Sequence, residues 1–163
     1  MKTLFLLRHA KAENPATGST DLDRALNERG RNEAQVMGTF LEKQNQKFDL
    51  VLCSTAARAR ETTELVLAAA ELTADVRYDG RIYEAGPLRL LEVISEIEGS
   101  MSAVLLVGHN PGMEELLKKL TGSPEQMATC TIAKIELSAE WSKALEGKVT
   151  LDLIVKPEAP VAG

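Results

Sequence analysis

The sequence predicts an α/β fold, a three-layer α/β/α sandwich around a mainly parallel, mixed central sheet. Three short apolar runs, at residues 3–7, 49–53 and 103–107, are typical of strands buried on both faces, and a helical pattern follows each of them. Strands that alternate with helices in this way form parallel sheets covered by helices. Two closing stretches, residues 132–137 and 149–155, alternate apolar and polar side chains instead. Because these stretches follow one another in the chain, we expect them to pair as an antiparallel edge.

Four helices are expected between and after the apolar strands. The first should begin at Asn27, a good N-cap residue, and cover about residues 27–46 with apolar side chains spaced by three and four. The second should cover about residues 59–72, and the third about residues 87–99, from a proline to a glycine. The fourth should stop at Gly122.

Length and composition limit the domain organisation and the class of protein. The chain has 163 residues, which suits one domain; we place it at residues 1–156 and expect the Pro/Ala-rich tail at 157–163 to be flexible. The longest apolar run, residues 65–70, is far shorter than the roughly 20 residues of a membrane span, and the start meets Arg8 too soon for a secretory signal. A net charge of −5 disfavours nucleic acid as a partner. We therefore expect a cytoplasmic monomer.

Cysteine and histidine usage predicts neither a disulfide framework nor a metal centre. The chain has two cysteines and two histidines, too few for a zinc cluster, and we expect no metal and no other cofactor. Asp21 and Asp23 are interpreted as loop residues rather than as ligands for a catalytic metal. No Gly-x4-Gly-Lys-Ser/Thr phosphate loop is present.

Polar residues follow three of the predicted strands at the points where the strands end. The first strand ends in Arg8 and His9, the second is followed by Ser54 and Arg58, and the third by His109 within a Gly-His-Asn-Pro-Gly turn. The carboxyl ends of parallel strands meet at the edge of the sheet where such folds bind ligands. Arginine and helix N-termini both bind phosphate oxygens. The sequence thus predicts a phosphoryl-binding site.

Simpler interpretations exist for each of these residues. A histidine at a strand end is more often structural than catalytic, but both of the chain's histidines fall directly after apolar strands, which favours a shared role. Arg58 could be a solvated helix residue, as Arg60 is expected to be, yet its place just after the strand end favours it over Arg60 for the site.

A thiolate phosphatase is the competing interpretation for the second strand end. Such enzymes use a Cys-x5-Arg loop, but Arg58 lies one residue too near Cys53 and Arg60 one residue too far, and the loop has no glycine. Cys53 and Cys130 are therefore interpreted as small buried hydrophobic residues.

The same segments resemble the histidine phosphatase (phosphoglycerate-mutase-like) superfamily. Arg8-His9-Ala10 resembles its Arg-His-Gly motif, and residues 54–62 are similar to its Ser-x3-Arg-Ala-x2-Thr segment. Residues 108–112 resemble its second histidine turn, and residues 23–30 the segment that leads into the first helix. The resemblance covers residues 3–155, and the small size makes the chain most similar to the short bacterial branch of SixA-type phosphohistidine phosphatases.

The resemblance implies a role for each site residue. His9 would be the nucleophile and become transiently phosphorylated, while Arg8, Arg58 and His109, the last as an imidazolium, would hold the phosphoryl oxygens. For His9 to attack, its other ring nitrogen should donate to a fixed acceptor such as a backbone carbonyl. Glu84 is the candidate general acid, with a solvated loop glutamate as the alternative.

Three functions remain open from the sequence. The first is a metal-independent phosphatase acting on phosphohistidine in a signalling or phosphotransfer protein, for which a weak acid suffices because the leaving nitrogen is readily protonated. The second is a small-molecule phosphomonoesterase, which would need a competent acid at Glu84. The third is a non-catalytic module that binds phosphorylated ligands, which the intact set of site residues disfavours.

Overall fold

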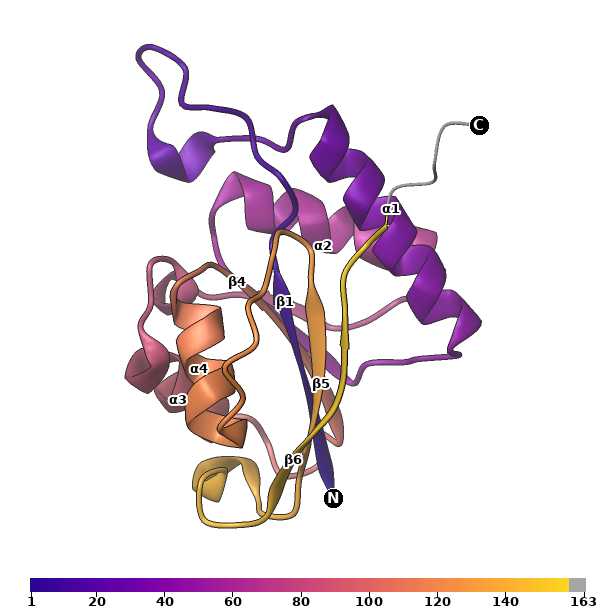
Figure 1. Cartoon of the computed structure of the whole chain (residues 1–163), viewed down its shortest axis with the longest axis vertical. Helices are drawn as coiled ribbons and strands as arrows, with labels where there is room; N and C mark the ends of the chain where they lie inside the picture. Colours follow the sequence, from indigo (N-terminus) through magenta and orange to yellow (C-terminus); the bar gives the residue numbers. More distant parts are fainter. Residues whose placement is uncertain (159–163) are drawn as a thin grey trace.

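A six-stranded sheet forms the middle layer of the computed structural model, which describes residues 1–158 (Figure 1). The strand order is β3-β2-β4-β1-β5-β6. The bounds are Lys2–Arg8 for β1, Leu50–Cys53 for β2, Val76–Tyr78 for β3, Ala103–Gly108 for β4, Ile132–Leu137 for β5 and Val149–Val155 for β6. Strands β1 to β4 run parallel to one another, whereas β5 runs antiparallel to both β1 and β6. The predicted mainly parallel sheet with an antiparallel edge is confirmed.

Two helices cover each face of the sheet (Figure 1). Alternate residues of β1 point to opposite sides, so Phe5 and Leu7 pack with the two helices on one face, while Leu4 and Leu6 pack with the two on the other. All four side chains are at most 3% exposed. This two-sided burial explains why the strand is an unbroken apolar run. The helices on the face of Phe5 and Leu7 are α1 (Glu28–Lys43) and α2 (Ala57–Ala69), and those on the face of Leu4 and Leu6 are α3 (Pro87–Ser95) and α4 (Gly112–Thr121).

The helix starts and stops largely follow the signals in the sequence. Asn27 caps α1 as expected, because its side chain accepts a hydrogen bond from the Gly30 N–H at 2.8 Å. Gly122 ends α4 in the left-handed conformation, with φ at 76°. The third helix is shorter than expected: it ends at Ser95, before Gly99.

The closing strands pair as predicted, but their alternation is interrupted. A register shift lies between Lys134 and Ile135 of β5. These residues pair with Leu153 and Leu151 of β6, so Asp152 has no residue opposite it in the strand pairing. After this bulge the inward face changes: Leu153 is 39% exposed, and Ile154 packs against the core instead. The regular alternation expected for residues 149–155 is therefore interrupted at the bulge.

Short elements were not foreseen from the sequence. The three-residue edge strand β3 and the 3-10 turns η1 (Asp21–Asp23), η2 (Gly80–Ile82) and η3 (Trp141–Lys143) carry no periodic pattern of their own.

None of the helices within residues 1–158 is long and apolar enough to cross a membrane. Of the tail expected at residues 157–163, residues 159–163 lie outside the described part.

Candidate active site

The two histidines meet at the carboxyl ends of the neighbouring strands β1 and β4. Arg8 pairs with Gly108 across these strands, so His9 and His109 leave the sheet side by side, and the His9 N–H donates to the Gly108 carbonyl at 3.0 Å. Their ring centroids lie 5.0 Å apart, and each residue is only 7% exposed. The parallel register therefore places both imidazoles in one site.

His9 is held with one ring nitrogen free. Its Nδ1 lies 2.7 Å from the carbonyl oxygen of Ala10, so Nδ1 carries the hydrogen and Nε2 keeps a lone pair. Burial, together with the nearby charges of Arg58 and Arg8, lowers the pKa of His9 to about 4, against the opposing effect of the Ala10 carbonyl. The ring is thus neutral near pH 7, with the fixed backbone acceptor expected of a nucleophilic histidine.

Thr62 of α2 fixes the residue that orients His9. The Thr62 hydroxyl accepts from the Ala10 N–H at 2.9 Å and donates to the Arg58 carbonyl at 2.7 Å. Ala10 is fully buried and is not among the residues with positive φ in the described chain, so alanine fits where the family has glycine.

His109 is neutral too, which differs from the expected imidazolium. Its Nε2 lies 2.7 Å from the Ser54 hydroxyl, and the edge of its ring faces Tyr83 with centroids 5.5 Å apart. Burial, with smaller contributions from His9 and Arg58, lowers the pKa of His109 to about 3. The Ser54 oxygen already accepts from the Ala56 N–H at 3.2 Å, and its hydroxyl hydrogen can be donated to Nε2. In that tautomer the ring's single hydrogen sits on Nδ1, a buried atom without a hydrogen-bond partner in the described chain.

The two arginines enter the site from β1 and α2. Arg58 is 5% exposed, and its guanidinium donates to the backbone oxygen of Asp21 at 2.7 Å and to the Asp21 carboxylate at 3.0 Å. Arg8 donates through Nη1 to the Met127 carbonyl at 3.1 Å. Arg60 is instead exposed, with its guanidinium 4.5 Å from the centre of the Tyr78 ring. The structure thus places Arg58, and not Arg60, at the site.

Unpartnered buried donors gather at these same residues. Within residues 1–158, four buried side-chain nitrogen or oxygen atoms lack a hydrogen-bond partner, and three of them are Arg8 Nε, Arg58 Nε and His109 Nδ1. Buried polar atoms without partners are rare and call for an explanation, such as a missing ligand. All three are nitrogen atoms that can donate, so the arrangement can bind an anion.

Asp21 lies in the connection between β1 and α1, as expected of a loop residue, and it also contacts Arg58 of the site, which the sequence did not predict. It lies in η1, on the segment between β1 and α1 that extends beyond the carboxyl edge of the sheet (Figure 1). The Tyr83 hydroxyl donates to its carboxylate at 2.5 Å, and this bond, together with Arg58, lowers the pKa of Asp21 to about 2. No spacing in the sequence links residues so far apart. Asp23, by contrast, is exposed and accepts only from Thr20, as a loop residue does.

Glu84 lies at the rim of this cluster. The residue is exposed, has a positive φ of 53° and directly follows Tyr83. The pKa of Tyr83 is raised to about 12, mainly by its hydrogen bond to Asp21 and in smaller part by the negative charge of Glu84. No hydrogen bond joins Glu84 to either histidine in the described chain. Its role as general acid stays a prediction.

The cysteines behave as buried hydrophobic residues. Burial raises the pKa of Cys53 to about 12, although the Thr63 hydroxyl donates to its sulfur at 3.2 Å. Burial also raises the pKa of Cys130. Because only the thiolate is nucleophilic, neither thiol is suited to attack phosphorus near pH 7.

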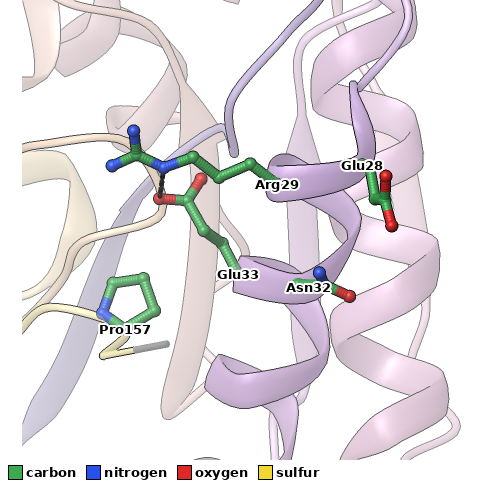
Figure 2. A pocket seen from close by; sticks show the side chains of 5 residues that line it. All are labelled: Glu28, Arg29, Asn32, Glu33 and Pro157. Carbon is green, nitrogen blue, oxygen red and sulfur yellow. Dashed lines mark ion pairs between the residues drawn. The ribbon is translucent and has the colours of Figure 1, made fainter. Parts of the chain in front are cut away.

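A pocket of about 370 Å³ lies apart from the histidines, at the start of α1 (Figure 2). In it the Arg29 guanidinium and the Glu33 carboxylate lie 3.9 Å apart. Glu33 also accepts from the Lys11 N–H at 2.9 Å and from the Thr129 hydroxyl at 3.0 Å, so it joins α1 to two other segments. None of the expected site residues lines this pocket, and residues 1–158 contain no group of three metal-binding side chains.

Comparison with known proteins identifies the family of this chain. The model of the histidine phosphatase superfamily (branch 1) matches residues 4–88. An uncharacterized protein of Mycobacterium tuberculosis is 34% identical over 89% of this chain and 96% of its own length. Two solved structures carry the provisional name phosphohistidine phosphatase SixA. The one from Agrobacterium tumefaciens has a TM-score of 0.84 and 32% identity, covering 96% of this chain and 98% of its own. The one from Nakamurella has a TM-score of 0.82 and 29% identity, covering 96% of each chain. This chain belongs to branch 1 of the histidine phosphatase superfamily.

Proposed function

We propose that this protein is a metal-independent phosphatase that removes the phosphoryl group from phosphohistidine in a signalling or phosphotransfer protein. The observation that carries the proposal is the set of three unpartnered donors, Arg8 Nε, Arg58 Nε and His109 Nδ1, beside a neutral His9. Two similar solved structures named SixA support the substrate class. The two guanidiniums supply the positive charge that a metal ion supplies in other phosphatases.

In the first step His9 takes the phosphoryl group. The lone pair of Nε2 forms a bond to phosphorus while the bond to the substrate's imidazole nitrogen breaks, and that nitrogen keeps the electron pair and takes up a proton. Charge spreads over the three equatorial oxygens in the transition state. Arg8, Arg58 and the Nδ1–H of His109 stabilise this charge because they are fixed before the reaction begins.

In the second step water regenerates the enzyme. A water molecule attacks phosphorus opposite His9, the electrons of the broken nitrogen–phosphorus bond return to Nε2, and phosphate leaves as the monoanion with both hydrogens of the water. The Ala10 carbonyl keeps the His9 ring in place through both steps, since it binds Nδ1 at 2.7 Å.

A small-molecule phosphomonoesterase is the second candidate, and the groups around Arg58 favour it. An alkoxide leaving group needs a proton, and Glu84, next to Tyr83 at the rim of the site, is a carboxyl group that could supply it, whereas Asp21 is ionised near pH 7. The two candidates differ in whether the reaction depends on such an acid.

Turnover on two substrate classes tests the proposal. We expect kcat/KM to be higher on a protein phosphorylated on histidine by phosphoramidate than on any member of a panel of phosphorylated metabolites, and EDTA to leave the rate unchanged. His9→Ala should lower turnover by at least about 10³-fold, since it removes the nucleophile, and should abolish the acid-labile phospho-enzyme. Arg60→Ala is the control, because Arg60 is exposed and outside the site.

Four results would contradict the proposal. A strict requirement for added metal ions would contradict the mechanism. Unchanged activity of His9→Ala would remove His9 as the nucleophile. A preference for a phosphorylated metabolite would favour the phosphomonoesterase, and binding without any turnover would favour the non-catalytic module.

A further inference from the structure

We infer that Glu114, in the first turn of α4, is a positioning residue that aims the phosphate-binding guanidinium of Arg8 by holding the Met127 peptide against it. The inference rests on the proposed function, because it concerns how the site binds a phosphoryl group. It gives Asn110, the residue after His109 in the Gly-His-Asn-Pro-Gly turn, a defined task as well.

Arg8 depends on one carbonyl group for its position. Its Nη1 donates to the Met127 carbonyl at 3.1 Å, while Nε is buried without a partner. Because Nε and Nη1 belong to the same planar group, the position of the Met127 carbonyl sets the direction in which Nε points. A planar guanidinium has fixed donor directions, so a shift of this acceptor would turn every donor of Arg8.

The Met127 peptide is itself held from both sides. Its N–H donates to Glu114 Oε1 at 2.8 Å, and its carbonyl accepts from Asn110 Nδ2 at 2.8 Å. The same Nδ2 donates its second hydrogen to Glu114 Oε1 at 2.9 Å. One carboxylate oxygen of Glu114 thus accepts hydrogen bonds from both the Met127 peptide and the Asn110 side chain, which itself donates to the Met127 carbonyl. Arg8 donates to the same carbonyl.

This anchoring matters because Met127 lies outside regular secondary structure. The segment between α4 and β5 has no helix or strand around this residue, and residues 124–126 are exposed. The Met127 side chain is buried in the core, and the hydrogen bonds of Glu114 and Asn110 set the orientation of its peptide. Since Asn110 directly follows His109, Glu114 couples Arg8 to the second histidine.

The next residue of α4 provides a matched control. Glu115 is exposed and makes no hydrogen bond through its side chain in the described chain, whereas Glu114 is half-buried. Both carry one negative charge on the same helical turn, so Glu115→Ala reproduces the change in net charge and helix composition without touching Met127.

The experiment measures the dissociation constant of tungstate, a tetrahedral oxyanion, by calorimetry for the whole chain. We expect Glu114→Ala to weaken binding by about 10- to 100-fold, the cost seen when an outer partner that orients a ligand-binding group is lost. Glu114→Gln should stay within about threefold of the wild type, because its amide oxygen can accept both hydrogen bonds. Glu115→Ala should bind as the wild type does.

A double-mutant comparison separates positioning from a general structural role. If Glu114 acts through Arg8, then Glu114→Ala should weaken binding no further in an Arg8→Ala background. An equal loss in both backgrounds would overturn the inference, as would wild-type affinity in a folded Glu114→Ala variant. If Glu114→Ala does not fold, Glu114→Asp takes its place, since it keeps the charge and shortens the reach by one methylene.

The result also distinguishes this inference from the proposed function. A wild-type protein that binds no tungstate would contradict both. A wild-type protein that binds tungstate but hydrolyses no phosphohistidine would contradict only the proposed substrate, and the comparison of Glu114 variants would still decide the positioning role.

Discussion

A phosphoryl group that binds Arg58 must compete with an anion already present, the carboxylate of Asp21. This carboxylate lies 3.0 Å from the guanidinium and accepts from Tyr83 at 2.5 Å. With a pKa of about 2, Asp21 is ionised near pH 7 and is a poor proton donor. The two carboxylates at the site therefore have different expected tasks: Asp21 shields Arg58, and Glu84 is left as the candidate acid.

Paired variants of these two carboxylates test this division. We expect Glu84→Gln to slow hydrolysis of an alkyl phosphate by about 10²-fold and phosphohistidine hydrolysis far less, because only the alkoxide needs an acid. Asp21→Asn should not show this selectivity; it should instead tighten tungstate binding by about two- to fivefold, the value of a partly exposed ion pair. Equal slowing of both substrates by Glu84→Gln would indicate a structural role for Glu84.

At the scale of elements, α4 and the loop before α3 meet at Gly112. A Cβ atom on Gly112 would collide with the Ala85 carbonyl, so only glycine allows this approach. The contact keeps the loop that carries Tyr83 beside the turn that carries His109. Close packing of two backbones thus places two side chains of the site next to each other.

Gly112→Ala should disturb this junction measurably. We expect the free energy of unfolding, from urea denaturation, to fall by about 1–3 kcal/mol because the backbones must move apart. Gly86→Ala is the control: a Cβ there meets nothing within 4 Å, and the φ of −84° suits alanine. A Gly112→Ala variant as stable as Gly86→Ala would show that the loop adapts without cost.

Periodic elements were predictable from the sequence, and short or irregular ones were not. The apolar runs of β1 and β4 are strong signals because burial on both faces requires them. The edge strand β3 has only three residues and no buried one, so its pairing with β2 is set by tertiary contacts. The bulge at Asp152 likewise depends on the neighbouring strand, which the local pattern does not encode.

The site divides in the same way. His9 and His109 directly follow β1 and β4, Arg8 is the last residue of β1, and Arg58 lies in the first turn of α2, shortly after β2. The carboxyl ends of the strands in a parallel sheet were therefore enough to bring these residues together. Asp21 reaches Arg58 through a long excursion of the chain between β1 and α1, and the position of such a segment depends on contacts such as that with Tyr83. Loop residues of this kind lack a sequence signal.

For the whole molecule, the two buried histidines predict how stability depends on pH. In the folded chain the pKa values of His9 and His109 are about 4 and about 3, well below the value of about 6.5 in an unfolded chain. Between these values the unfolded chain binds protons that the folded chain does not. Stability is therefore full above about pH 6.5 and falls as the pH drops toward 4.

Urea denaturation between pH 4.5 and 7.5 measures this effect. Over the full range down to its folded pKa, the loss should be about 3 kcal/mol for His9 and about 5 kcal/mol for His109. His9→Gln and His109→Gln should each remove part of the slope, because glutamine does not titrate, and the double variant should be nearly flat above pH 5. The chain has only two histidines, so no other imidazole can replace them. If the double variant keeps the slope of the wild type, the acid sensitivity arises from carboxylates, and the two rings are not held neutral by burial in the folded protein.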